Sequence, residues 1–426
     1  MISKIKIWHF ILLIIALIII FRFSHLLELI NLLVQIIKSI FLNTESALAQ
    51  LNLSVIDSIV SLLLIILLSI IIISSNRLKK LLSQNLRISN SILVILVIWF
   101  LFAPLITIQH PDFQKNMSVT KLLPPFSDVD YIELNDPTTN LDNTKNHLEK
   151  LIDEVIPKSY NEGIIFIDSI KADKEIKYYQ SGVLFQLDKN KVKMLNNHPM
   201  IKSKLFLLGS DEYGRDVFTR IVYGSRISLL VGLGAVLVSF IIGLSLAFFA
   251  VEQGGFVNLF ISRITDLFLS FPAIFLVILI IALFGSNIFS IIVVLGFSGW
   301  MSFFKVAKSE MLSVKNKEFY LSAKLIGLKN IKLLLREILP AIIIPVSVNL
   351  IFQLSNVILA ESALSYLGLG TGNEYPSWGA MIEAGQEYIS QSWWLIFIPG
   401  LILVISLLSI NEVGRNINKE LNPAIK

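Results

Sequence analysis

Eight long apolar stretches divide this 426-residue chain. About 20 consecutive apolar residues are enough for a helix to cross the hydrocarbon core of a bilayer. In lipid every backbone polar group must be satisfied internally, so such segments cross as helices. The sequence therefore predicts an all-α protein that crosses a membrane several times. The stretches lie at about 5–23, 54–74, 91–108, 227–250, 267–284, 288–304, 341–360 and 392–410.

Composition agrees with a membrane location and excludes several other classes. Hydrophobic residues make up 54% of the chain and charged residues only 16%, a balance that soluble domains do not reach. The absence of cysteine excludes disulfides and thiol chemistry. The five histidines form no cluster with metal-ligand spacing, and we find no catalytic constellation, cofactor motif or nucleic-acid patch. Neither an enzyme nor a metal site is expected.

Basic residues set the predicted orientation, because loops rich in Lys and Arg stay in the cytoplasm. The linker between the second and third stretches has four basic residues and no acid (Arg77, Lys79, Lys80 and Arg87), so it is placed inside. Alternating from there puts both termini in the cytoplasm and residues 109–204 outside. The last loop, with Glu374, Glu383 and Glu387 and no Lys or Arg, also lies outside.

Two segments are less regular. Residues 26–50 are apolar but interrupted by charges, and are expected either to lie on the outer membrane surface as an amphipathic helix or to extend the first span. Residues 109–204 are polar, with two short strand patterns at 162–170 and 177–187 and a helix pattern at 146–156. They predict a small α+β extracytoplasmic insertion.

The segment 305–340 is basic and amphipathic, and it lies between two strongly apolar stretches. Gly327 falls between two helical runs, where a residue that tolerates positive φ ends a helix. Pro340 opens the next apolar run, and proline suits the first turn of a helix. Eight basic residues place this segment on the cytoplasmic side: Lys305, Lys308, Lys315, Lys317, Lys324, Lys329, Lys332 and Arg336.

The spacing from Gly327 to Pro340, with Ser322-Ala323-x-x-x-Gly327 before it, resembles the cytoplasmic coupling loop of ABC-importer permeases. Further segments resemble the C-type permeases for oligopeptides, dipeptides and nickel, in the order of that family. They are LLGSDEYGRDVFTRIVYGSRISLLVGL (207–233), DLFLSFPAIFL (266–276), Trp300, LAESALSYLGLG (359–370) and PSWGAMI (376–382). The resemblance covers residues 205–423, about half of the chain.

The resemblance implies a type I ABC-importer transmembrane fold, organised as four regions. Residues 1–90 would be an additional N-terminal membrane region, 91–108 the first family-type span, 109–204 the insertion, and 205–426 the permease core with the coupling loop 305–340. The sequence departs from the family twice. Leu321-Ser322-Ala323 replaces the usual Glu-Ala-Ala, for which Glu318 one turn earlier offers a carboxylate. Three spans also precede the outer segment, where the family usually has one.

The function implied is that of a permease subunit in an ATP-driven, binding-protein-dependent importer of peptides or similar small solutes. No P-loop motif is present, so ATP hydrolysis is assigned to separate chains. The expected partners are a homologous second permease, two ABC ATPase subunits, an extracytoplasmic solute-binding protein and membrane lipid. The residues assigned to ATPase coupling are Glu318, Ser322, Ala323, Gly327 and Pro340.

Polar residues in or beside the apolar stretches are the other candidates. Asn349, Gln353 and Asn356 share one helical face, which predicts either interhelical hydrogen bonds or a translocation path. Glu361, near the outer end of the same span, is expected to be paired or near the interface, and it is grouped with that path. Asp266 is expected at the N-terminus of the 267–284 helix. An outer elbow of Asp211, Arg215, Asp216 and Arg220 is expected to be a structural element in which the two arginines pair with the two aspartates; direct contact with the substrate is the alternative.

Two other classes remain open. An ion-coupled secondary carrier usually buries ionisable groups in mid-membrane, and this sequence places almost none there. A membrane receptor or scaffold would use residues 109–204 as its working part. Sensitivity of uptake to uncouplers rather than to ATP depletion would favour the carrier.

Overall fold

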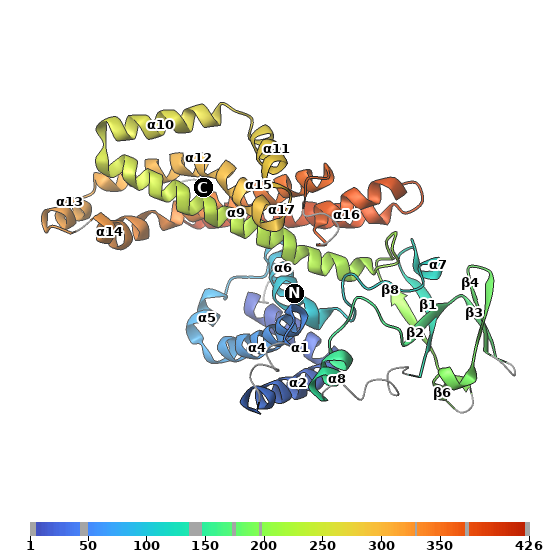
Figure 1. Ribbon diagram of the computed structural model, residues 1–426. Coiled ribbons are helices and arrows are strands. Elements are labelled where there is room, and N and C mark those ends of the chain that lie inside the picture. Colours follow the sequence, from blue (N-terminus) through green and yellow to red (C-terminus); the bar gives the residue numbers. More distant parts are fainter. Residues whose placement is uncertain are drawn as a thin grey trace. The chain divides into compact units, whose positions relative to one another are not determined.

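The computed structural model describes residues 6–42, 50–135, 147–172, 176–195, 198–328, 330–370 and 375–421 (Figure 1). Lys329 and Glu374 of the sequence analysis lie outside these ranges. The chain forms two compact units. The first comprises Met1–Arg87, Val94–Ser225 and Ala384–Pro399, and the second Ile88–Leu93, Arg226–Glu383 and Gly400–Lys426.

Helices form the N-terminal part of the first unit: α1 (Ile7–Phe21), α2 (Phe23–Leu42), α4 (Leu53–Ser74), α5 (Asn76–Leu81) and α6 (Ile88–Ile106). The predicted first span is wrong in its extent, because α1 has only 15 residues and a new helix begins at Phe23. Arg22 marks the break. Its guanidinium donates to the carbonyls of Leu105 and Thr107 at the end of α6, both at 3.2 Å, which holds a charged side chain between the two helices.

Short strands and two helices make up the middle of the chain: α7 (Met117–Thr120), β1 (Ser127–Glu133), α8 (His147–Val155), β2 (Ile164–Ile167), β3 (Ser169–Ala172), β4 (Ile176–Gln180), β5 (Val183–Leu187), β6 (Met194–Leu195), β7 (His198–Pro199) and β8 (Ile201–Phe206). The strands pair antiparallel in the orders β2-β1-β8, β3-β4-β5 and β6-β7. The predicted helix is present, whereas the strand predicted at 162–170 is divided into β2 and β3 and the one predicted at 177–187 is the hairpin of β4 and β5.

Helix α8 does not pack against these strands as the core of a separate small domain would. Its buried residues Leu148, Ile152 and Val155 belong to the same apolar cluster as Leu29 and Leu32 of α2. Apolar residues at positions i, i+4 and i+7 give α8 one face to bury, and α2 covers that face. The middle of the chain is thus anchored on the N-terminal helices.

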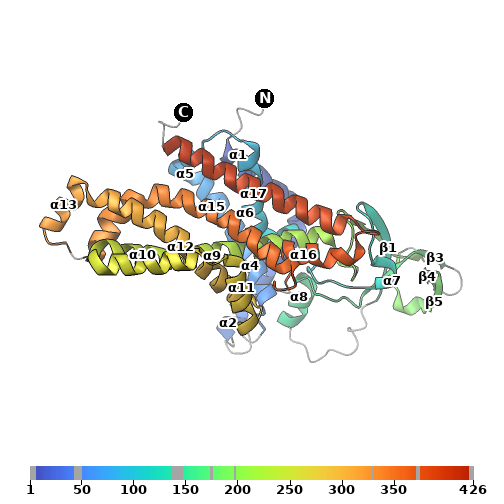
Figure 2. The same ribbon diagram turned by 90° about the horizontal axis from the view of Figure 1, so that it is seen from above.

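The second unit is built from long helices: most of α9 (Val217–Gln253), then α10 (Gly255–Leu269), α11 (Ala273–Phe284), α12 (Ile288–Lys315), α13 (Glu318–Leu325), α14 (Asn330–Leu333), a five-residue π-helical turn (Leu334–Ile338), α15 (Leu339–Tyr366), α16 (Trp378–Gly385) and the later part of α17 (Trp394–Leu421). Helix α10 runs back beside α12, and the two views in Figures 1 and 2 agree on this.

The predicted 267–284 span is wrong as a single helix. Helix α10 ends at Leu269 and α11 begins at Ala273, and the two are bent by 87°. Pro272 explains the break, because proline disfavours helical geometry in the residue before it and cannot donate a backbone hydrogen bond. Asp266 accordingly lies in the last turns of α10 rather than at a helix N-terminus, so that prediction is also wrong.

The predicted helical, multi-span membrane fold is confirmed. Among the described residues, seven helices are long and apolar enough to cross a membrane, or eight if the bent pair counts as one span. They include the predicted stretches at 54–74, 91–108, 227–250, 288–304, 341–360 and 392–410, several of them extended by one or more turns. The segment Phe23–Phe41 also meets the criterion, a third possibility beside the two predicted for residues 26–50.

Two apolar clusters lie along α9, α12 and α15 in the second unit. Between them α9 and α12 cross closely, because Gly296 presents no side chain to Val238. A Cβ on Gly296 would lie 2.5 Å from the Cβ of Val238. At this crossing the hydroxyl of Ser239 donates to the carbonyl of Gly296 at 2.6 Å. Small residues and a hydroxyl are the usual means of bringing membrane helices together.

Candidate functional site

The segment between α12 and α15 forms a projecting tip. Helix α12 continues to Lys315, α13 follows as an eight-residue helix, and Gly327 ends it with φ of +84° as predicted. The amide of Gly327 donates to Lys324 O at 3.1 Å, and that of Leu328 donates to Ala323 O at 3.3 Å. This pair of bonds is a Schellman turn, which satisfies the last carbonyls of the helix and reverses the chain.

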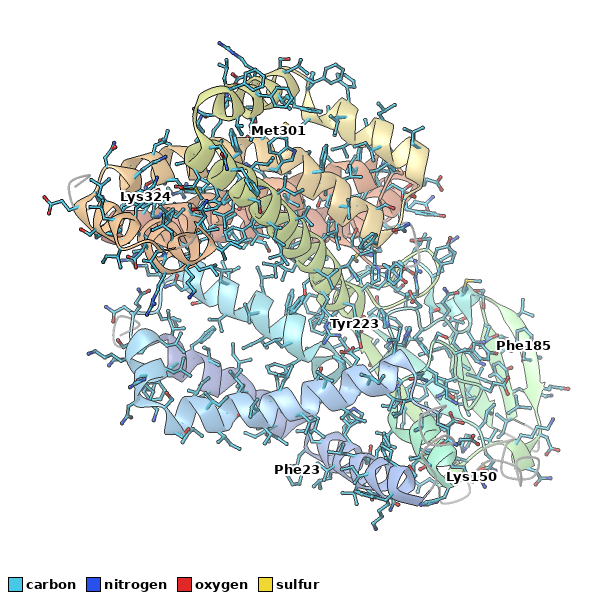
Figure 3. The ribbon with its side chains drawn as sticks, turned by 60° about the vertical axis from the view of Figure 1, so that its left-hand side comes forward. Phe23, Lys150, Phe185, Tyr223, Met301 and Lys324 are labelled. Atoms are coloured by element: carbon cyan, nitrogen blue, oxygen red, sulfur yellow. The ribbon has the colours of Figure 1, made fainter. Side chains whose placement is uncertain are left out.

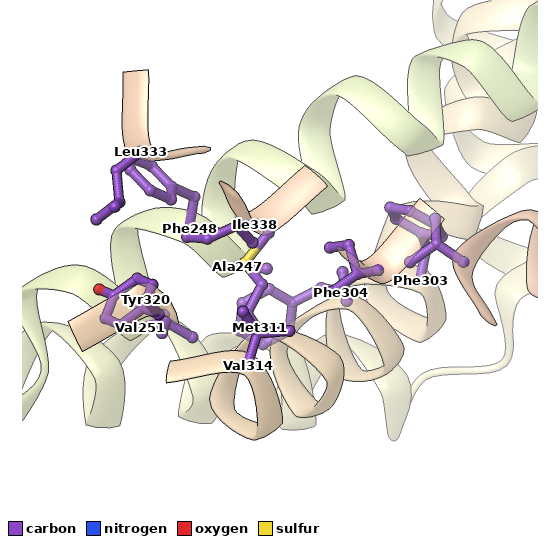
Figure 4. Packing of buried hydrophobic residues seen from close by; sticks show 14 of the residues in the cluster. Ala247, Phe248, Val251, Phe303, Phe304, Met311, Val314, Tyr320, Leu333 and Ile338 are labelled. Atoms are coloured by element: carbon purple, nitrogen blue, oxygen red, sulfur yellow. The ribbon is translucent and has the colours of Figure 1, made fainter. Parts of the chain in front are cut away.

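One face of α13 is held firmly by the rest of the unit. Tyr320 and Ala323 are buried in a cluster with Val251 of α9 and Met311 and Val314 of α12 (Figure 4). A hydroxyl inside an apolar cluster needs a partner. The Tyr320 hydroxyl donates to a carboxylate oxygen of Glu252 at the end of α9, and burial together with this acceptor raises the pKa of Tyr320.

The opposite face of α13 is exposed and apolar. Leu325 and Ile326 are 88% and 83% exposed, and Phe319, Leu321 and Ile331 are exposed with them. Among the residues assigned to coupling, Glu318 and Ser322 share this exposed surface, whereas Ala323 faces the buried cluster. Lys324 marks the same tip in Figure 3. Large apolar side chains gathered on an exposed surface are typical of sites at which proteins bind a partner.

Three lysines of α12 tie the base of the tip to α9 and α10. The ammonium of Lys315 donates to Val251 O at 2.6 Å, and a cation suits the carbonyl end of a helix. Lys305 pairs with Asp266 at 2.9 Å, and Lys308 donates to Ser262 Oγ at 2.7 Å. From their sequence positions these lysines predict only the orientation of the segment. Pro340 lies in the first turn of α15, as predicted.

The outer elbow before α9 is a buried network of charges in the first unit. Arg215 Nε donates to Asp211 Oδ2 at 2.6 Å, and Arg220 Nε lies 3.6 Å from the same oxygen. Both arginines are 4% exposed. Arg220 Nη1 also donates to Asp112 Oδ1 at 3.0 Å, so a residue 108 positions away supplies an acid that the sequence analysis did not identify.

Asp216 has a different role from the one predicted. Instead of pairing with an arginine, its carboxylate accepts hydrogen bonds from the amide and hydroxyl of Thr219, the amide at 3.0 Å. This is helix N-capping, because an aspartate immediately before the first turn satisfies an otherwise unpaired amide. The predicted pairing of Asp216 with an arginine is therefore wrong, and Asp216 caps α9 instead.

The three polar residues of α15 differ in burial and in hydrogen bonding. Asn356 is exposed and Asn349 half-buried, whereas both polar atoms of the Gln353 side chain are buried without a hydrogen-bond partner among the described residues. A Cβ on Gly299 would lie 2.2 Å from Gln353 Nε2, so this side chain lies directly on the backbone of α12. Sharing a helical face did not give these three residues a common environment.

Glu361 is fully buried and, of the two alternatives predicted for it, its contacts agree with a paired carboxyl. Its carboxylate accepts hydrogen bonds from Ser365 Oγ at 2.9 Å and Ser228 Oγ at 3.3 Å. Ser228 belongs to α9, and its approach to Glu361 could not be read from local sequence.

These elements define a class of protein: a multi-pass helical membrane protein in which a packed tip with exposed apolar side chains joins two long helices. The family model for the binding-protein-dependent transport system inner membrane component matches residues 239–426. The dipeptide transport system permease protein DppC of Alkalihalophilus pseudofirmus is 34% identical over 218 residues, which are 51% of this chain and 72% of that protein. The oligopeptide transport system permease protein OppC of Escherichia coli is 34% identical over 239 residues, which are 56% of this chain and 79% of the length of OppC.

The chain belongs to this family of binding-protein-dependent inner-membrane transport components. Among solved structures, an amino acid ABC transporter with histidines is similar with a TM-score of 0.39 and 14% identity, covering 48% of this chain and 94% of that one. The MetNI methionine transporter is similar with a TM-score of 0.38 and 18% identity, covering 46% of this chain and 94% of that one.

Proposed function

We propose that this chain is a permease subunit of an ATP-driven, binding-protein-dependent importer of peptides or similar small solutes, and that α13 couples it to a separate ATPase. The observation that carries the coupling is the division of α13 into two faces. One face is buried against α9 and α12, and the other presents Leu325 and Ile326 uncovered. The names of its dipeptide and oligopeptide permease relatives support the solute class.

The contacts of α13 suit it to transmit movement. Tyr320 and Ala323 fix it to the ends of α9 and α12, and the Tyr320–Glu252 hydrogen bond adds a directional link. A partner that grips the exposed face and moves on binding ATP would shift α13 as a rigid piece together with the ends of both long helices. Such a nucleotide-biased pair of arrangements is what alternating access requires.

The remaining partners follow from the same proposal. A homologous second permease would complete the path, two ABC ATPase subunits would bind the two tips, and an extracytoplasmic solute-binding protein would deliver the solute. The chain would lie in the cytoplasmic membrane with both termini in the cytoplasm, its helices facing lipid where no subunit covers them. No ATP hydrolysis is assigned to this chain.

The test replaces Gly327 by proline. Proline fixes φ near −65°, opposite in sign to the +84° found, and removes the amide that bonds to Lys324 O. The reoriented tip should abolish ATP-dependent peptide uptake by the assembled transporter in vesicles, while the protein still reaches the membrane. Gly327→Asn is the matched control, because asparagine tolerates the left-handed region, and it should retain most uptake.

Uptake that persists in Gly327→Pro would refute the coupling role. The wild-type chain should also bring down a second permease and an ATPase when it is purified gently from its own membrane. Recovery of the chain alone, from a preparation that keeps other ABC complexes intact, would count against the importer itself.

A further inference from the structure

A group of hydroxyls from three helices surrounds the buried carboxyl of Glu361 in the second unit. Ser228 belongs to α9, Ser362 and Ser365 to α15, and Ser377 immediately precedes α16. Ser377 Oγ lies 3.5 Å from Ser365 Oγ, and all four serines are at most 5% exposed. We call this set the Glu361 cluster.

The cluster is closed by tight packing of the α16 segment onto α15. A Cβ on Gly379 would lie 2.6 Å from Ser362 Cα, and one on Gly370 would lie 2.0 Å from Ser365 Oγ. Only glycine lets the two backbones approach this closely. The oxygens are therefore held in place by backbone contacts and not only by their own hydrogen bonds.

The hydrogen bonds within the cluster do not use all the lone pairs of its hydroxyl oxygens. Ser228 Oγ accepts from the amide of Trp378 at 3.4 Å, and Ser377 Oγ accepts from the amide of Ala380 at 3.2 Å. Ser362 Oγ is buried and makes no hydrogen bond of standard geometry among the described residues, although it interacts with the Glu361 carboxylate. Its lone pairs are therefore available to a bound group.

Charge points to the nature of that group. A carboxylate enclosed by neutral hydroxyls inside a membrane protein is expensive, because hydroxyls supply hydrogen bonds but no compensating charge. Glu361 also lies in the last two turns of α15, where the carbonyl end of the helix favours a positive ion. One carboxylate balances a single positive charge, whereas sites for divalent ions such as calcium gather several carboxylates.

We propose that the Glu361 cluster binds a monovalent metal cation, with sodium as the ion to test, through the Glu361 carboxylate and the hydroxyl oxygens of Ser228, Ser362, Ser365 and Ser377. A hydroxyl can donate to the carboxylate while a lone pair faces the ion. The bound ion joins α9, α15 and the α16 segment. This assignment does not depend on the proposed transport partners, and it can be tested on the chain alone.

The experiment measures thermal unfolding of the full-length chain in lipid nanodiscs, in equal concentrations of sodium chloride or choline chloride. Equal concentrations hold ionic screening constant. A ligand that binds only the folded state raises stability with its concentration, so Tm should increase with sodium in the wild type. Glu361→Gln should remove this dependence, whereas Glu383→Gln, a half-buried carboxyl on α16 outside the cluster, should keep it.

A wild-type Tm that is the same in sodium and choline would overturn the proposal. If Glu361→Gln does not fold, Ser377→Ala gives a second reading, because losing one ligand should shift the sodium dependence to higher concentration. Binding of radiolabelled sodium by the wild type, competed by unlabelled sodium and absent in the variant, would confirm an ion site. No saturable binding would reject it.

Discussion

Arg215 shows how one residue secures the outer elbow. Its side chain is 5% exposed and reaches Asp211 at 2.6 Å and Glu212 at 3.4 Å. Both acids are also nearly buried, so removing the arginine would leave negative charge in a place that water cannot reach. Breaking a buried pair from one side costs far more than the pair itself contributes.

Arg215→Ala should therefore destabilise the protein by about 3–5 kcal/mol. The exposed pair of Lys158 and Asp153, at 2.8 Å, is the control, and Lys158→Ala should cost less than about 1 kcal/mol. Thermal unfolding in detergent measures both. Equal effects of the two substitutions would show that the elbow is solvated in solution.

Lys204 is a second residue of interest, because its charged side chain is largely buried beside an aromatic ring. Its ammonium lies 4.1 Å from the centre of the Phe206 ring and donates to Gln109 Oε1. Burial lowers the pKa of Lys204 to about 8, although the negative charge of Asp216 opposes the shift. The folded state therefore holds this proton less tightly than the unfolded chain does.

The stability of the protein should consequently rise with pH between about 8 and 10.5, the pKa window of Lys204 in the folded and unfolded states. Below about pH 8, Lys204 is protonated in both the folded and the unfolded state, so the full free-energy cost of burying its charge remains. The gain, on the order of 3 kcal/mol, should be missing from Lys204→Met. Unfolding curves for both proteins across this range measure the difference, and parallel pH profiles would contradict the shift.

At the scale of elements, the α9–α12 crossing depends on the absence of a side chain. Gly296 and Ser239 let the two helices approach, and the Ser239 hydroxyl bonds across the gap. The separation is set by backbone atoms, since Ala235 O would also lie 2.9 Å from a Cβ on Gly296. Carbonyl oxygens of a helix cannot move aside as the end of a flexible side chain can.

Gly296→Ala should therefore cost about 1–3 kcal/mol through overpacking. Gly400 of α17 is the matched control, because a Cβ there would meet only Ile382, at 4.0 Å. Gly400→Ala should be neutral or slightly stabilising, as expected for alanine in a helix. Chemical unfolding in mixed micelles compares them, and a crossing that accepted alanine at no cost would be looser than described here.

The elements were predictable to different degrees. The existence of most spans follows from the length of their apolar runs, and Gly327 and Pro340 follow from local backbone preferences. The break at Pro272 was hidden because the apolar run continues on both sides of it. Arg22, Asp112 and Ser228 act through contacts about 80 to 130 positions away, and one sequence without an alignment carries no signal for those.

At the scale of the whole molecule, the N-terminal helices gain a role that the sequence did not suggest. Helix α8 lies in the middle of the chain, yet its apolar face is buried against α2. The additional N-terminal region thus supports the inserted segment that follows it. Helix α8 of the predicted insertion and helix α2 of the predicted additional N-terminal region thus share one apolar core.

Ile152→Asp should undock α8, because it places a charge in the cluster shared with Leu29 and Leu32 of α2. Limited proteolysis should then cut faster within residues 147–156, while the spans stay protected. Glu154→Ala on the exposed side of the same helix should leave the cleavage rate unchanged. Cleavage that is equally slow in both variants would show that α8 is held by something other than α2.

The 87° break between α10 and α11 has a consequence for the surrounding lipid. Helix α11 has 12 residues and so rises only about 18 Å, whereas the hydrocarbon core of a bilayer is about 30 Å thick. Its side chains Phe275, Leu279 and Leu283 are apolar and exposed. By itself α11 is therefore too short to match the hydrocarbon core, and lipid along it would favour a thinner bilayer, so the stability of the protein would depend on bilayer thickness.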